Sequence, residues 1–113
     1  MVNIQIIGTK KCKDTKKAQR FFKERGITPQ FVNLNERELS SGEYNKIFAK
    51  LAPEECIDTE SKEFKKRKME YMVYDAEEEL REDRFLLKTP IVRSGSDVFI
   101  GNAPDSWETL ISK

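Results

Sequence analysis

The strongest constraint on the fold of this 113-residue chain is the order of its strand-like and helix-like segments. Residues 2–7 mostly alternate between apolar and polar side chains, a pattern that predicts a strand. From Asp14 to Arg25 the apolar residues recur at helical spacing among charges, and Gly26 is placed to end that helix. Residues 30–34 alternate again and predict a second strand. We therefore expect the first third of the chain to form a β-α-β unit.

The middle of the chain is expected to be helical. Ser40 and Glu43 have the spacing of a capping box, in which each side chain bonds to the backbone of the other residue. A second such pair, Asp75 and Glu78, lies within residues 53–88, where helical patterns occur in short pieces. These patterns predict one helix after Ser40 and a helical insert over about residues 53–88.

The last quarter of the chain returns to strands. Residues 91–93 and 97–100 are two short segments rich in β-branched and aromatic residues, separated by a turn that contains glycine, which predicts a β-hairpin. A third capping box, beginning at Asp105, predicts a final helix. Helices placed between two parts of one small sheet are typical of a thioredoxin-like α/β fold. We predict a single domain over residues 1–113, with a mixed central sheet flanked by helices.

Composition excludes several classes of function. The chain has 21 basic and 20 acidic residues, so it lacks the basic excess of a nucleic-acid binder. No apolar run reaches the roughly 18 residues of a membrane span, so we expect no membrane contact and a cytoplasmic protein. Histidine is absent, which excludes histidine-based catalysis and the commonest zinc sites, and we expect no metal. Two cysteines are too few for the disulfide framework of a small secreted domain.

Cys12 is the candidate nucleophile, because it lies where the first strand gives way to the first helix. Unpaired backbone N–H groups and the positive end of the helix dipole favour a thiolate at such a junction. Lys10 and Lys11 precede it, and we expect both to stabilise the thiolate further. The alternative is that Cys12 is a small apolar filler beside an ordinary solvated row of lysines.

Two other residues bear on the chemistry of Cys12. Thr15 occupies the position where a dithiol oxidoreductase has its second cysteine. Its hydroxyl could donate to the Cys12 sulfur or satisfy the amides of the first helical turn. Cys56 is the other thiol, and either it resolves a disulfide with Cys12 or it is a structural cysteine, which we favour.

The segment from Gly8 to Ala18 resembles the N-terminal signature of the ArsC/Spx/YffB family, in which a strand, a polar turn, a cysteine and a lysine-rich helix follow one another. Residues 89–92 resemble the late Arg-Pro-Ile-Val segment of that family. Gly101 and the short helix that follows it match its closing element. The resemblance covers nearly the whole chain in element order.

The resemblance implies a thioredoxin-like fold in which the Thr89–Pro90 bond is cis and faces Cys12. It is closest to the YffB-like branch, which has a single active cysteine. By that analogy Cys12 forms a mixed disulfide with a small thiol or a protein thiol, and Thr89 and Pro90 bind this partner. Glutathione is the candidate co-substrate, and no bound cofactor is expected.

The chain also departs from the family. Arsenate reductases of the family hold the oxyanion with arginines, and Glu60, Thr89 and the Ile100–Gly101 pair stand at the corresponding places. We therefore expect no true arsenate reduction. The Spx branch, which regulates transcription through RNA polymerase, usually has a Cys-x-x-Cys motif that Thr15 interrupts. A regulatory protein without enzymatic activity, or a purely structural relative, remains the alternative.

Overall fold

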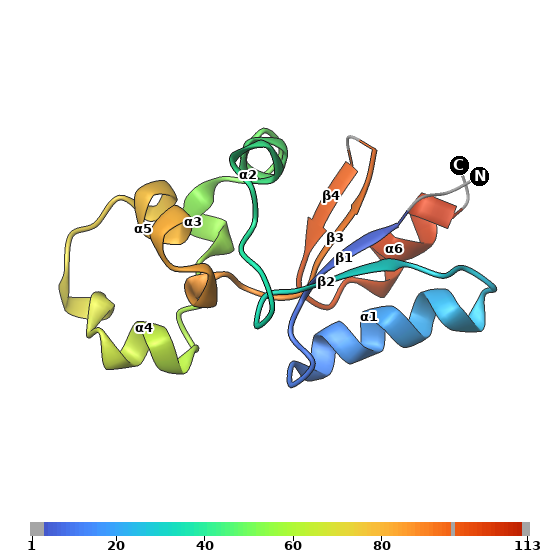
Figure 1. Cartoon of the computed structure of the whole chain (residues 1–113), viewed down its shortest axis with the longest axis horizontal. Helices are drawn as coiled ribbons and strands as arrows, with labels where there is room; N and C mark the ends of the chain where they lie inside the picture. Colours follow the sequence, from blue (N-terminus) through green and yellow to red (C-terminus); the bar gives the residue numbers. More distant parts are fainter. Residues whose placement is uncertain (1–3, 96, 112–113) are drawn as a thin grey trace. The chain divides into compact units, whose positions relative to one another are not determined.

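The computed structural model describes residues 4–95 and 97–111. The chain divides into two compact units, one of residues 1–37 and 89–113 and the other of residues 38–88. The first unit contains all four strands and two helices (Figure 1). The second unit contains the remaining helices, and each unit is described separately below.

A four-stranded mixed sheet forms the centre of the first unit. Its strands are β1 (Gln5–Gly8), β2 (Gln30–Asn33), β3 (Ile91–Ser94) and β4 (Asp97–Ile100), in the spatial order β2-β1-β3-β4. β1 pairs in parallel with β2, whereas β1 with β3 and β3 with β4 are antiparallel. The mixed sheet and the β3–β4 hairpin are as the sequence predicts. Of the first predicted strand, Val2 and Asn3 lie outside the described residues.

Helices α1 (Lys13–Glu24) and α6 (Pro104–Ile111) cover one face of this sheet. Ile6 and Val92 point from the strands into a core that Phe22 of α1 and Trp107 of α6 complete. After α1, Gly26 adopts a positive φ of 77°, which permits the helix to end there as its sequence predicts.

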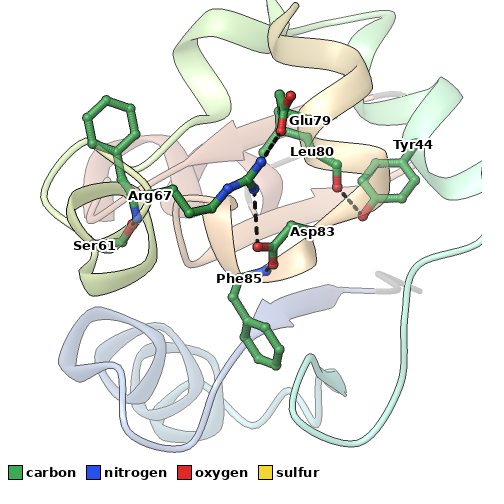
Figure 2. A network of polar contacts seen from close by, with 8 residues as sticks. Tyr44, Ser61, Arg67, Glu79, Leu80, Asp83 and Phe85 are labelled. Carbon is green, nitrogen blue, oxygen red and sulfur yellow. Dashed lines mark hydrogen bonds and ion pairs between the residues drawn. The ribbon is translucent and has the colours of Figure 1, made fainter. Parts of the chain in front are cut away.

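The second unit is built from short helices. They are α2 (Ser41–Phe48), α3 (Pro53–Cys56), α4 (Lys62–Lys66) and α5 (Ala76–Glu82), with 3₁₀ turns η1 (Met69–Tyr71) and η2 (Arg84–Leu86). The buried hydroxyl of Tyr44 donates to the carbonyl oxygen of Leu80, which ties α2 to α5. Figure 2 shows Arg67 between the carboxylates of Glu79 and Asp83, with which it forms ion pairs.

The helix starts agree only partly with the sequence patterns. Ser40 and Glu43 form the reciprocal capping box that their spacing predicts, and Asp75 caps α5 through its side chain. The capping box predicted at Asp105 is wrong, because α6 begins at Pro104 and Asp105 lies within its first turn. Proline suits the first helical position, where its missing N–H costs no hydrogen bond. No helix among the described residues is long and apolar enough to cross a membrane.

Candidate active site around Cys12

Cys12 lies at the junction that the sequence predicts. β1 ends at Gly8, and a turn closed by the bond from the Cys12 amide to the Thr9 carbonyl (3.2 Å) leads into α1. Cys12 is the N-cap of α1 with extended backbone angles, and its carbonyl accepts the first helical bond from the Lys16 amide. The amides of the first turn of α1 therefore face the residue that carries the thiol.

The sulfur of Cys12 contacts a residue that is 77 positions away in the sequence. Thr89 Oγ1 donates a hydrogen bond of 3.1 Å to Cys12 Sγ, and Sγ lies 3.7 Å from the Thr89 carbonyl oxygen. The Thr89–Pro90 peptide bond is cis, so the predicted geometry and its proximity to Cys12 are confirmed. Cys12 as a residue is partly exposed.

Thr15 supplies the second hydroxyl of the site. Its side chain is fully buried, and Oγ1 has no conventional hydrogen-bond partner in the described part of the chain. The Thr15 side chain packs on Gly8, where a Cβ atom would lie 2.3 Å from Oγ1. The predicted role of the Thr15 hydroxyl in stabilising the Cys12 thiolate therefore remains a prediction.

These contacts shift the ionisation of the thiol. Partial burial acts to raise the pKa of Cys12, but the nearby Thr15 hydroxyl and the hydrogen bond from Thr89 Oγ1 act to lower it. The backbone amides of Thr15 and Asp14 add to that opposition, and the net effect is a pKa below the ordinary cysteine value. Because the thiolate is the nucleophilic form, the surroundings of Cys12 increase its reactivity near neutral pH.

Cys56 has the opposite environment. It is the last residue of α3, it is fully buried, and both cysteines are free thiols. Burial, followed by repulsion from Glu55 and Glu54, raises the pKa of the Cys56 thiol to about 11. The side chain is therefore a neutral thiol at physiological pH and a poor nucleophile.

The lysines before Cys12 are both exposed. Lys10 Nζ lies 3.9 Å from Glu36 Oε1, so one carboxylate already shares its charge. The predicted role of Lys10 and Lys11 in stabilising the thiolate thus remains a prediction. No group of His, Cys, Asp and Glu side chains within residues 4–95 and 97–111 is arranged to hold a metal ion.

Among the described residues, the side-chain partners of Arg93 and Arg67 do not include Cys12. Arg93 lies opposite Gln5 in the sheet, at the far end of β1 from Cys12, and its Nε donates to Gln5 Oε1. Arg67 is paired with Glu79 and Asp83 in the second unit. Glu60 is exposed and lies 3.7 Å from Lys65.

Solved structures with the same arrangement of elements are numerous. The YffB (PA3664) protein superposes with a TM-score of 0.83 at 18% identity over 96% of this chain and 98% of its own. An arsenate reductase from Vibrio cholerae gives a TM-score of 0.81 at 16% identity over 96% and 98%. The glutaredoxin Grx-1 from Archaeoglobus fulgidus gives 0.51 at 14% identity over 100% and 89%. This chain has the thioredoxin-like fold of the ArsC-related proteins.

Within this ArsC-type fold the resemblance seen in the sequence is structural as well. The likeness to the YffB protein and the arsenate reductase extends over nearly the whole of each chain. No protein-family model matches the sequence, and no curated protein does. At identities below one fifth, the chemistry has to be argued from the residues around Cys12.

Proposed function

We propose that this chain is a monothiol thiol-disulfide oxidoreductase of the ArsC family, with Cys12 as its nucleophile. The observation that carries the proposal is the hydrogen bond from Thr89 to the Cys12 sulfur, beside the buried hydroxyl of Thr15. Together with the first-turn amides, these donors lower the pKa of Cys12 in a position that remains partly exposed. Structural cysteines are usually buried without such donors.

The proposed reaction transfers glutathione through Cys12. The Cys12 thiolate attacks the glutathione sulfur of a mixed disulfide on another protein or of oxidised glutathione. A bond forms between Cys12 and that sulfur, and the former partner leaves as a thiolate, which takes up a proton. A second glutathione thiolate then attacks the bound glutathione sulfur. It releases the Cys12 thiolate and oxidised glutathione, so no oxidant beyond the substrate disulfide is required.

The second step is assigned to an external thiol because of the residues around Cys12. Thr15 stands where a resolving cysteine would lie in a Cys-x-x-Cys motif. The remaining thiol, Cys56, is fully buried and has a pKa of about 11. Glutathione is the abundant small thiol of reducing compartments such as the cytoplasm, where we propose that the protein works.

Arsenate reduction is not part of the proposal. The oxyanion would need fixed positive charge next to Cys12, and the residue that touches the sulfur from the proline loop is the neutral Thr89. Arg93 lies at the opposite end of β1. Removing one preorganised donor from an oxyanion site typically lowers the rate by about 10²–10³-fold. A site without the arginines of an arsenate reductase is therefore expected to reduce arsenate very slowly.

The experiment is intact mass spectrometry after incubation with oxidised glutathione. We expect one glutathione on the wild-type chain and on Cys56→Ser, none on Cys12→Ser, and complete removal by added reduced glutathione. A folded wild-type chain that takes up no glutathione, or takes it up equally in Cys12→Ser, would contradict the proposal. That outcome would favour the regulatory binding protein named as the alternative.

A further inference from the structure

A hollow lies in the first unit, at the end of the sheet away from Cys12. It has a volume of about 350 Å³ and is lined by side chains and backbone of Gln5, Gln30, Arg93, Ile4, Thr28 and Gly95. Gln5 is the first residue of β1, whereas Cys12 follows the last residue of that strand. The hollow is therefore separate from the proposed thiol chemistry.

Strand register explains why polar side chains gather there. Gln5 is opposite Gln30 in β2 and opposite Arg93 in β3, and paired residues on adjacent strands point to the same face of a sheet. The next row on that face consists of Ile7, Val32 and Ile91, all of them buried. One end of an otherwise apolar sheet face thus carries three side chains with hydrogen-bonding groups.

Arg93 is the charged member of this row. Its Nε donates to Gln5 Oε1 at 3.0 Å, and the side chain is partly buried. Within the described part of the chain, no carboxylate forms an ion pair with Arg93, and its Nη groups form no hydrogen bond. The described lining of the hollow contains no acidic residue. A partly buried guanidinium without a counter-charge is a strong site for an anion.

We propose that this hollow binds the carboxylate group of a small molecule or peptide. A planar carboxylate presents two oxygens at the spacing of the two guanidinium Nη groups, so that both can be bonded at once. The bond from Arg93 Nε to Gln5 holds the guanidinium plane, and the Thr28 hydroxyl and Gln30 amide supply further donors in the wall. Among the described lining residues Arg93 alone carries a positive charge, which matches a monoanion.

The test compares propionate with propionamide, which has nearly the same shape and no charge. Each is titrated into ¹⁵N-labelled full-length protein while the Arg93 side-chain signal and the Gln5 and Gln30 amide signals are followed by NMR. We expect saturable shifts with propionate and at least tenfold weaker binding of propionamide. Chloride at high concentration should weaken the propionate shifts by screening the guanidinium.

Variants show whether propionate binds in the hollow or to positive charge elsewhere on the surface. We expect Arg93→Gln to weaken propionate binding at least tenfold and Arg93→Lys to weaken it less, because lysine keeps the charge but not the two-pronged geometry. Arg20→Gln, which removes an exposed charge from α1, should bind as the wild type does. Equal shifts with propionate and propionamide, no saturable shift, or unchanged binding in Arg93→Gln would overturn the proposal. If Arg93→Gln does not fold, the comparison with propionamide and the Arg93→Lys variant still test the proposal.

Discussion

Gly8 and Thr15 are packed so tightly that a Cβ atom at residue 8 would lie 2.3 Å from Thr15 Oγ1 and 2.7 Å from Thr15 Cγ2. Such distances are too short for real side-chain contacts, so any larger residue at position 8 must displace Thr15 or the strand. The absence of a side chain at Gly8 leaves room for the Thr15 side chain in the core. Because the Thr15 hydroxyl also lowers the pKa of Cys12, the same small residue helps to keep the thiol ionised.

We therefore expect Gly8→Ala to lower the free energy of unfolding by about 1–3 kcal/mol, the usual cost of overpacking a core, and to slow alkylation of Cys12 near neutral pH. Chemical denaturation and the alkylation rate measure the two effects. Gly42→Ala is the matched control, because a Cβ atom at residue 42 would lie 3.9 Å from Ser40 Oγ, an ordinary contact distance. Alanine there should stabilise α2 by about 0.4–1 kcal/mol, and a Gly8→Ala variant of unchanged stability would contradict the packing argument.

The two hydroxyls beside the sulfur give a second prediction. Thr15→Val and Thr89→Val keep the side-chain shape but remove a donor, so each should raise the pKa of Cys12 and slow its alkylation severalfold at neutral pH. Thr109→Val is the control, because that exposed hydroxyl bonds to the Ser106 carbonyl. Alkylation rates in both site variants equal to that of the control would show that the hydroxyls have no electrostatic role.

Much of this arrangement follows from the sequence, and the reasons are local. The capping box at Ser40 and the glycine stop after α1 depend on residues within one helical turn, which a pattern reports directly. The placement of Cys12 at a strand-to-helix junction is equally local. The start of α6 shows where such patterns fail. An acidic residue in the first turn of a helix and an N-cap residue give similar sequence patterns, so Asp105 is taken for the N-cap of a helix that begins at Pro104.

The contact that brings a hydrogen-bond donor to the Cys12 sulfur joins residues far apart in the sequence. Thr89 reaches Cys12 only because β3 pairs antiparallel with β1, which sets Ile91 opposite Ile7 near the end of the strand that leads to Cys12. The same register carries Arg93 to Gln5 at the other end. Register between strands so far apart in the chain depends on tertiary packing, so the sequence predicts Thr89 only through the family resemblance.

Cys56 provides a third prediction, based on its burial. With the pKa raised from 9.0 to about 11, the native state holds a proton that the unfolded chain loses in this range. The free energy of unfolding should therefore fall as the pH rises from about 9 to 11, by on the order of 2 kcal/mol more than in Cys56→Ala. Urea denaturation at several pH values measures the difference, and parallel pH profiles for the two proteins would contradict it.

A fourth prediction concerns arsenate. We expect turnover with glutathione and glutaredoxin supplied to stay at the level of Cys12→Ser, because no arginine contacts the Cys12 sulfur among the described residues. The measurement is arsenite formation over time. Cys12-dependent turnover comparable to that of a genuine arsenate reductase would show that other cations hold the oxyanion.

The most direct test of the central claim is the pH dependence of alkylation at each cysteine, followed by peptide mass spectrometry in the native and the denatured chain. The account predicts that native Cys12 reacts with a midpoint below that of the same residue in the denatured chain, since hydrogen bonds stabilise its thiolate. Buried Cys56 should remain unmodified until the chain unfolds. A native Cys12 midpoint equal to or above the denatured value would contradict the assignment of Cys12 as an activated nucleophile.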